Sequence, residues 1–277
     1  MGRIIAVVNQ KGGVGKTTSA VNLTACLHDL GLKVLLCDFD PQANATSGFG
    51  ISKKKIKYSV YDTIINDIEA RQAIVSTKFG DVLPASADLA GAGVELVTID
   101  QPHYRLSAAL KPLQEEYDLI LIDCPPSLEM LTLNALAAAD GILIPVQCEY
   151  YALEGLSDLM NTLRMVKRRI NPGLEVFGVM LTMFDGRTNF STQVAQEVRR
   201  HFPGKVYTTV IPRNIRLAEA PSHGVPVTAY DRSSRGSAAY KAVAEEIYRK
   251  WLRLRLICGS IFVVNTSVFP MRTRRGR

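Results

Sequence analysis

Short runs of apolar residues alternate along the chain with segments of helical periodicity. Residues 4–8 (Ile-Ile-Ala-Val-Val) are apolar without interruption and end at a glycine-rich loop, a pattern typical of a buried parallel strand. Apolar residues then recur at helical spacing over residues 17–30, and Gly31 would end that helix. Further apolar runs predict strands at residues 33–37, 119–122, 141–146, 176–182 and 206–211. Further periodic segments predict helices at about residues 128–138, 152–169, 190–201 and 235–250.

Strands that alternate with helices predict an α/β fold with a doubly wound, mostly parallel sheet flanked by helices. No internal repeat or low-complexity linker interrupts residues 1–250, so we expect one domain there. Residues 50–110 are less regular and contain a basic surface segment at residues 53–57. Residues 251–277 follow as a basic C-terminal extension, and the pattern leaves open whether it is ordered.

The composition is that of a globular protein in a reducing compartment. Hydrophobic residues make up 47% of the 277 residues and charged residues 21%, which is enough to bury a core. The five cysteines are scattered and form no CxxC pair, which favours buried thiols over a zinc or iron–sulfur site. No apolar run is long enough for a membrane span or a signal peptide, so we expect a cytoplasmic protein.

The net charge of +7 belongs mostly to the C-terminal extension. Residues 251–277 contain six arginines and no acidic residue. The other 27 of the 33 basic residues face 26 acidic ones, so residues 1–250 carry a charge of about +1. Any binding of nucleic acid by this body must therefore depend on a local patch of cations.

A phosphate-binding loop is indicated by the segment Lys11-Gly12-Gly13-Val14-Gly15-Lys16-Thr17-Thr18. It lies between a predicted strand and a predicted helix, where glycine N–H groups can close on phosphates. Lys16 would reach the β- and γ-phosphates, the Thr17 hydroxyl would bind Mg²⁺, and Thr18 would lie near the α-phosphate. The usual motif has glycine at position 10, but Gln10 stands there. The sequence instead matches the variant Lys-Gly-Gly-x-Gly-Lys-Thr-Thr, in which Lys11 precedes the loop.

Aspartates follow two of the predicted strands. Asp123 comes directly after the apolar run 119–122, an arrangement typical of a Walker B acid that holds Mg²⁺, often through water. Asp38 and Asp40 follow the strand at 33–37. Any one of these acids could instead cap a helix. Because parallel strands end at the same edge of a sheet, we expect all three beside the phosphate loop.

Five segments of the chain resemble the ParA/Soj family of chromosome- and plasmid-partition ATPases: residues 8–18, 38–46, 123–127, 145–155 and 211–222. The resemblance covers about residues 3–250 and is closest to the Soj-like subgroup. It implies a P-loop ATPase of the deviant Walker A type, with ATP and Mg²⁺ as cofactors. It also implies a cycle in which ATP closes a homodimer that binds double-stranded DNA without sequence preference, at the nucleoid. A ParB-type partner would then stimulate slow hydrolysis.

The resemblance further implies roles for individual side chains in catalysis. Lys11 would reach across the dimer to the partner's nucleotide and stabilise charge there, much as an arginine finger does. Asp40 would position or polarise the attacking water. Asp38 would contribute to the magnesium and switch region.

Other residues would bind adenine and DNA. The segment Pro212-Arg213-Asn214 matches the part of the family that contacts adenine, although Arg213 could also be structural. Arg187 and Arg216 match positions that contact DNA in Soj-like proteins, and Arg187 could alternatively be a solvated loop charge. With a body charge of about +1, such contact would require two of these patches to meet in the dimer.

Three other functions share the variant loop. A MinD-like ATPase that cycles on membranes and positions the division site would need an amphipathic C-terminal helix. A cargo-positioning relative of ParA would use the same mechanism as a partition ATPase. A reductase of the nitrogenase iron-protein type would need two cluster cysteines, and Cys124 has no suitable partner in the sequence.

The extension at residues 251–277 does not match the family, and it has three interpretations. It could have no function, it could add electrostatic affinity for DNA, or it could rest on a membrane surface as the MinD tail does. Its β-branched residues and glycine interrupt any amphipathic helix, so we expect no stable membrane association.

Overall fold

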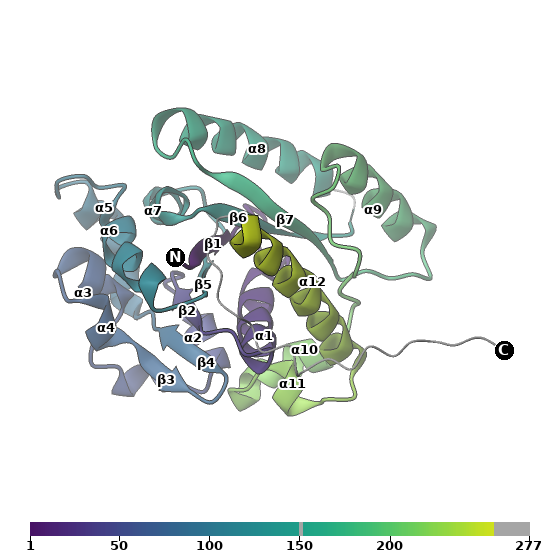
Figure 1. Cartoon of the computed structure of the whole chain (residues 1–277), viewed down its shortest axis with the longest axis horizontal. Helices are drawn as coiled ribbons and strands as arrows, with labels where there is room; N and C mark the ends of the chain where they lie inside the picture. Colours follow the sequence, from purple (N-terminus) through teal and green to yellow (C-terminus); the bar gives the residue numbers. More distant parts are fainter. Residues whose placement is uncertain (150–151, 258–277) are drawn as a thin grey trace.

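The computed structural model describes residues 1–149 and 152–257. Its seven described strands form one sheet in the order β3-β4-β2-β5-β1-β6-β7 (Figure 1). Neighbouring strands are parallel except β3 and β4. The strands are β1 (Arg3–Val7), β2 (Val34–Asp38), β3 (Val75–Thr77), β4 (Gly80–Leu83), β5 (Leu119–Asp123), β6 (Gly141–Gln147) and β7 (Glu175–Thr182). The predicted doubly wound, mostly parallel α/β fold is confirmed.

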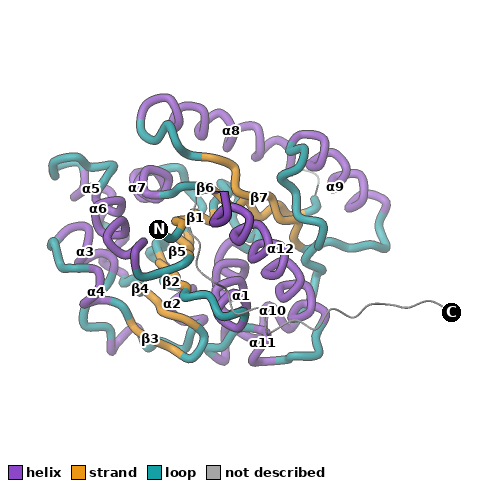
Figure 2. The backbone as a smooth tube through the Cα atoms, viewed as in Figure 1, coloured by secondary structure: helices purple, strands orange, loops and turns teal. Residues whose placement is uncertain are grey.

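Helices cover both faces of this sheet, and Figure 2 shows the strands lying between the two helical layers. On one side lie α3 (Val60–Ile65), α4 (Ala70–Ala73), α5 (Ala92–Leu96), α6 (Arg105–Leu110), α7 (Met130–Ala138), α8 (Ala152–Arg169) and α9 (Asn189–His201). On the other lie α1 (Lys16–Asp29), α2 (Asn44–Gly48), α10 (Arg216–Glu219), α11 (Val227–Tyr230) and α12 (Arg235–Ile257). Successive residues of β1 face opposite layers, which explains why its apolar run is continuous.

The strand predicted at residues 206–211 is wrong. This segment makes one isolated bridge to β7, from Val206 to Val179, and just past it Pro212 bridges Phe184, which follows β7. Between them the Glu246 carboxylate of α12 accepts the backbone N–H groups of Thr208 and Thr209, at 2.8 and 2.9 Å. Because a side chain binds these donors, they cannot form a continuous ladder with β7.

The less regular region at residues 50–110 contains four short α-helices and the two short strands β3 and β4, of which β3 is at the edge of the sheet. Both strands are too short to leave a clear period in the sequence. They extend the sheet beyond β2, with β4 parallel to β2 and β3 antiparallel to β4. The four described cysteines, at positions 26, 37, 124 and 148, are buried as predicted, and Cys258 lies outside the described residues.

The last helix continues past residue 250, where the sequence pattern ended it. Helix α12 runs to Ile257 and crosses the position at which we divided the body from the basic extension. Trp251 is 5% exposed and belongs to the core on the α1 side of the sheet. Its indole N–H donates to the Asp118 carbonyl at 3.3 Å. Our interpretations of the rest of the extension concern residues 258–277, which lie outside the described residues.

Replacing Trp251 with alanine should destabilise the fold by about 3 kcal/mol or more, because it empties a large buried site. In a thermal melt, this corresponds to a fall of several degrees in Tm. The matched control is Arg253→Ala on the same helix, where the side chain is exposed and little change is expected. An unchanged Tm in Trp251→Ala would show that the helix beyond residue 250 does not contribute to the core.

Candidate active site

The phosphate loop connects β1 to α1 and adopts a conformation that requires glycine. Gly13 and Gly15 have φ angles of +73° and +89°, in the left-handed region where a side chain is strained. Gly15 directly precedes the first residue of α1. The Thr182 hydroxyl at the end of β7 donates to the Val14 carbonyl at 2.9 Å and ties the loop to the sheet. Free N–H groups of the first helical turn therefore face the position where phosphates would bind.

Lys16 lies at the mouth of this loop and is 7% exposed. Its ammonium group donates to the Lys11 carbonyl at 3.1 Å, so the side chain folds back over the loop. Burial lowers the pKa of Lys16, while the nearby carboxylates of Asp123 and Asp40 act in the opposite direction. The Lys16 ammonium group thus lies near the acids Asp40 and Asp123 and across the loop in which phosphates would bind.

Asp38 and Asp123 meet because the strands that carry them end together. In the parallel pairing of β2 with β5, Asp38 lies opposite Asp123. In the pairing of β1 with β5, Asp123 lies opposite Val7, just before the phosphate loop. Both carboxylates are fully buried. The register of the parallel strands therefore brings Asp38 and Asp123 together, as predicted.

Asp123 is the described acid best suited to hold a cation. Neither of its buried carboxylate oxygens has a hydrogen-bond partner of good geometry. Burial raises the pKa of Asp123 well above its usual range, and Asp38 raises it further, whereas the Thr17 hydroxyl and Lys16 lower it. A buried carboxylate with free lone pairs beside a threonine hydroxyl fits a hydrated Mg²⁺, which takes oxygen ligands.

Asp38 is held differently from Asp123. One of its oxygens accepts both the backbone N–H and the hydroxyl of Thr46, each at 2.7 Å, and the other accepts the N–H of Asp40 at 3.3 Å. The Thr46 hydroxyl also accepts the N–H of Ala85 at 3.1 Å. Asp38 therefore braces the segment that follows β2, which is consistent with a place in the switch region. Thr46 lies in the motif at residues 38–46, but its contact to Ala85 was not foreseen.

The buried Asp38 carboxyl should make the nucleotide-free fold sensitive to pH. Burial raises its pKa from 3.8 to about 6, so between these values the folded chain binds more protons than the unfolded chain. The stability that this group contributes is therefore lost as the pH rises from about 4 to about 6. Thermal melts of wild type across this range should show a loss that Asp38→Asn reduces. Asp100→Asn at an exposed site is the control, and equal pH profiles for wild type and Asp38→Asn would contradict the assignment.

Asp40 follows β2 at the opening of a tight turn. Its carboxylate accepts the N–H of Gln42 at 2.9 Å, and its carbonyl accepts the N–H of Ala43 at 2.8 Å. The side chain is 8% exposed and close enough to Lys16 to affect the pKa of that lysine. Among the described residues, the hydrogen bond from Gln42 occupies one carboxylate oxygen, and the other is left for a further partner.

Lys11 does not join the buried cluster. Its side chain is 35% exposed, and its ammonium group lies 3.9 Å from the Glu149 carboxylate just beyond β6. The same carboxylate accepts from Arg213 at 3.1 Å and from Gln147 at 2.5 Å. Glu149 thus links the forward lysine to the segment 212–214. In the sequence, Glu149 belongs to the motif 145–155, part of which (150–151) lies outside the described residues, and nothing in that motif indicates this link.

A cavity of about 330 Å³ opens next to the loop on the α12 side. It is lined by Gly15, Thr18, Thr182, Met183, Ile211, Pro212, Arg213, Asn214, Ile215, Leu217, Ala218 and Tyr240. The predicted adenine segment 212–214 therefore forms part of its wall, and Thr18 joins it to the phosphate loop. Its apolar walls and few polar groups suit a flat heterocycle.

The two arginines predicted to contact DNA lie outside the nucleotide site, and both are ion-paired. Arg187 pairs with Asp185 at 2.7 Å, and its side chain is 89% exposed. The Arg187 hydrogen bonds lower the pKa of Asp185 to about 2. Arg216 pairs with Glu219 at 2.7 Å and with Asp231 at 3.3 Å.

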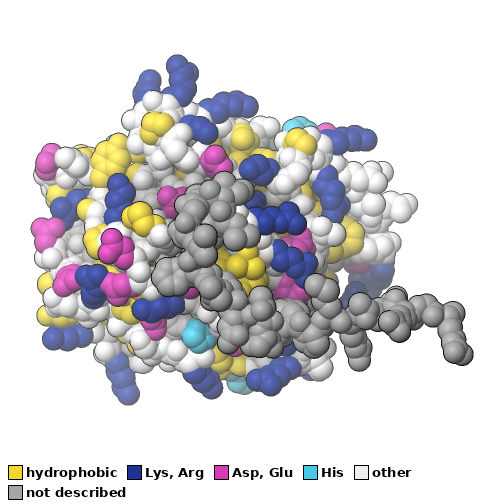
Figure 3. Space-filling model, in the orientation of Figure 1, with side chains coloured by type: hydrophobic (Ala, Val, Ile, Leu, Met, Phe, Trp, Pro, Cys, Tyr) yellow, Lys and Arg dark blue, Asp and Glu magenta, His cyan; other side chains and the backbone are white. Residues whose placement is uncertain are grey.

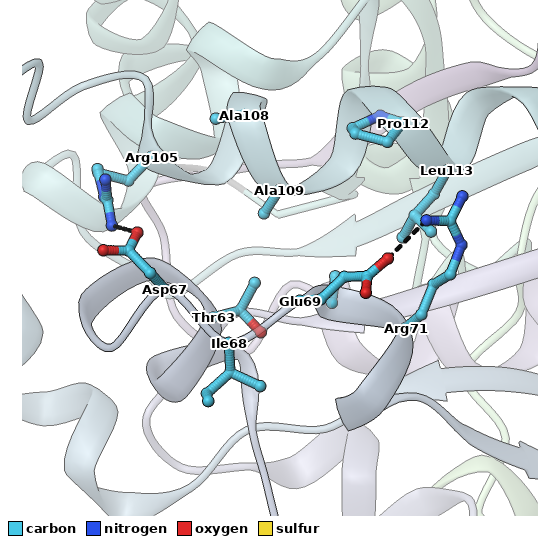
Figure 4. Close-up of a pocket in the computed structure, with 11 residues that line it drawn as sticks. Thr63, Asp67, Ile68, Glu69, Arg71, Arg105, Ala108, Ala109, Pro112 and Leu113 are labelled. Atoms are coloured by element: carbon cyan, nitrogen blue, oxygen red, sulfur yellow. Dashed lines mark hydrogen bonds and ion pairs between the residues drawn. The ribbon is translucent and has the colours of Figure 1, made fainter.

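A second hollow, of about 250 Å³, lies between the α3–α4 turn and α6 (Figure 4). Its charged side chains face one another: Arg105 pairs with Asp67, and Arg71 pairs with Glu69. Because these charges are already balanced, the hollow does not offer a free charge to a ligand. The buried acids and the glycine loop lie instead at the carboxyl ends of β1, β2 and β5.

Comparison with known proteins supports a nucleotide site at this edge. A family model described as an AAA domain matches residues 2–176. The sporulation initiation inhibitor protein Soj of Bacillus subtilis is 55% identical over 249 residues, which is 89% of this chain and 98% of that protein. The chromosome partitioning protein ParA of Myxococcus xanthus is 51% identical over 252 residues, which is 90% of this chain and 89% of that protein.

Among solved structures, one described as cobyrinic acid a,c-diamide synthase from Mycobacterium smegmatis, with bound ADP and magnesium, matches with a TM-score of 0.80. It is 37% identical and covers 92% of this chain and 97% of its own. Its bound ligands are those that the buried acids and the glycine loop described above would accommodate. Its name describes a different chemistry from those of the two more closely related proteins.

Proposed function

Because this chain belongs to the ParA/Soj family of partitioning ATPases, we propose that it is a nucleotide-dependent switch that moves DNA or a DNA-bound cargo. With ATP and Mg²⁺ bound, it closes into a homodimer that binds double-stranded DNA without sequence preference. Hydrolysis, stimulated by a ParB-type partner, returns it to monomers. The observation that carries this proposal is the buried cluster of Lys16, Asp40 and Asp123 at the loop, with Lys11 left outside it.

ATP binding uses the loop and the adjoining cavity. N–H groups of residues 12–18 surround the phosphates, and Lys16 exchanges the Lys11 carbonyl for phosphate oxygens. The adenine ring fills the cavity walled by residues 212–214. Thr17 and Asp123 hold the Mg²⁺, with Asp38 behind them, and the cation neutralises phosphate charge.

Dimer formation uses Lys11. The side chain is partly exposed and pairs with Glu149 at 3.9 Å rather than with the phosphate position of its own chain. We expect it to exchange this exposed ion pair for contact with a second subunit. There it stabilises the charge that develops on the transferred phosphoryl group. Asp40 orients the attacking water through its free carboxylate oxygen.

DNA binding depends on bringing small patches together. Figure 3 shows Lys and Arg side chains mixed with Asp and Glu on the face in view, in keeping with a body charge of about +1. A dimer places two copies of Arg187 and two of Arg216 on one assembly, or four phosphate contacts. With a slope of about −0.9 per contact, fourfold more salt should weaken binding roughly a hundredfold.

The proposal is tested by measuring the affinity of the full-length protein for a labelled duplex of mixed sequence without nucleotide, with ADP and with ATP. Tight, salt-sensitive binding only with ATP is the expected result. The main alternative is a MinD-like ATPase that cycles on membranes. Within the described ranges, no helix is long and apolar enough to cross a membrane. ATP-dependent binding to anionic liposomes, with no binding to DNA, would favour that alternative and overturn the proposal.

A further inference from the structure

Two carboxylates balance the charge of Arg216 in this structure. Its guanidinium lies 2.7 Å from Glu219 and 3.3 Å from Asp231, with its side chain 47% exposed. The Tyr230 hydroxyl donates to the same Glu219 oxygen at 3.2 Å and holds that carboxylate in place. An incoming phosphate would have to compete with both carboxylates and would be repelled by them. As it stands, Arg216 is not presented to DNA.

Asp231 is anchored to the phosphate-loop side of the fold. It directly follows α11, and the Asn22 side chain of α1 accepts the N–H of Val227, the first residue of α11, at 2.7 Å. The amide group of Asn22 also donates to the Thr18 carbonyl at 2.7 Å. The Asp231 carboxylate is itself oriented by the N–H and hydroxyl of Ser233. Asp231 therefore keeps its place relative to α1.

Arg216 is anchored to the adenine cavity instead. Its N–H donates to the Asn214 side chain at 3.0 Å, and Asn214 lines the cavity. Leu217 and Ala218 of α10 also line the cavity. Ile215, which precedes α10, lines the cavity and is 69% exposed. A base that fills the cavity contacts α10 directly, so it acts on the element that carries Arg216.

Arg187 provides a contrast within the same chain. Its partner Asp185 is two residues away in the same loop and also accepts the Arg187 N–H at 3.1 Å. This pair closes on itself and does not bridge two elements. Of the two arginines, Arg216 is the one whose ion pair, with Asp231, joins an element at the cavity to a segment fixed on α1. The hydrogen bond from Tyr230 to Glu219 connects the same two parts of the chain.

We infer that Asp231 is a positioning residue that, together with Glu219 on α10 itself, withholds Arg216 from DNA until a nucleotide base contacts α10. That contact moves Arg216 away from Asp231 and leaves it beside one carboxylate instead of two. This inference rests on the proposed function and adds to it a release step that any adenine nucleotide triggers, before the ATP-specific closure of the dimer. Exposed ion pairs contribute little net stability, so a small displacement is enough to release the guanidinium. The coupling requires that the base bind the released arrangement better than the paired one.

The test uses Asp231→Asn in the full-length protein. Asparagine can still accept the Ser233 bonds but no longer offers a charge to Arg216. Without nucleotide, affinity for a labelled duplex should rise about threefold, since that is the scale of an exposed ion pair. The salt slope should steepen by about 0.9 per arginine released. With ATP the affinity should barely change, so the ratio of the two affinities falls.

Three comparisons make the result decisive. Adding Arg216→Ala to Asp231→Asn should remove the gain. Glu219→Gln should also raise the affinity for DNA without nucleotide. This variant keeps the inference testable if Asp231→Asn does not fold. Glu245→Gln removes the same charge and frees Arg249 on α12, and it should leave the ATP dependence intact.

The possible failures are distinguishable. Wild type that binds DNA only with ATP, together with unchanged nucleotide-free binding in both Asp231→Asn and Glu219→Gln, rejects this inference and leaves the proposed function standing. The inference is also rejected if the variants gain the same affinity for DNA with and without ATP, or if Glu245→Gln gains as much as they do. Either result would show that the gain comes from the change in net charge. Wild type that binds no DNA in any nucleotide state rejects the proposed function and the inference with it.

Discussion

Lys16→Ala should lower the affinity for ATP by at least about a hundredfold. Hydrogen bonds to charged groups contribute about 1.5–3 kcal/mol each, and we expect Lys16 to make one to each of two phosphates. The side chain is 7% exposed and already directed across the loop, so little ordering is needed when phosphate replaces the Lys11 carbonyl. Calorimetric titration with Mg·ATP measures the loss directly.

A thermal melt gives an independent measurement of the same change. At a ligand concentration about 100 times its Kd, wild type gains about 2.7 kcal/mol, and Lys16→Ala should gain almost none. The matched control is Lys11→Ala, which removes the same charge from the same loop. This variant should bind ATP normally but remain monomeric in gel filtration. Wild-type affinity in Lys16→Ala would reject the assignment of the loop.

Asp40→Ala should stop turnover while leaving ATP bound. A carboxylate that positions or deprotonates the attacking water contributes about 10²–10⁴-fold, so phosphate release should fall by at least about a hundredfold. The variant should accumulate as an ATP-bound dimer that stays on DNA after free ATP is removed. Single-turnover hydrolysis and gel filtration report the two effects separately.

The backbone role of Asp40 needs its own control. Its carboxylate accepts the Gln42 N–H and helps to form the turn, so alanine could act by loosening that turn. Asp40→Asn keeps an acceptor for Gln42 but lacks the negative charge. Loss of turnover in both variants assigns the effect to the charge. If Asp40→Asn hydrolyses ATP at the wild-type rate, or if Asp40→Ala stays monomeric with ATP, the proposed role of Asp40 is wrong.

The sequence predicted the structure correctly where local hydrophobic pattern and strand order determine it. The apolar runs located β1, β2, β5, β6 and β7, and the rule that parallel strands end together brought Asp38 beside Asp123. The pattern failed at residues 206–211, because the competing acceptor Glu246 is on α12, far along the chain. It also ended α12 too early, since the burial of Trp251 depends on its contact with Asp118 and on the core between α12, α1 and the sheet.

The sequence by itself determined the doubly wound sheet, the phosphate loop and the three acids at its edge, because each depends on local spacing and on the shared direction of parallel strands. Only the tertiary structure decided which charges are free and which are already balanced. Glu149 holds Arg213 from 64 residues away, and Asp231, which follows α11, pairs with Arg216 at the start of α10. Ion pairs between elements depend on how those elements pack, and no local period encodes that packing. The loop could therefore be found from its own residues, whereas the state of the arginines that it would control could not.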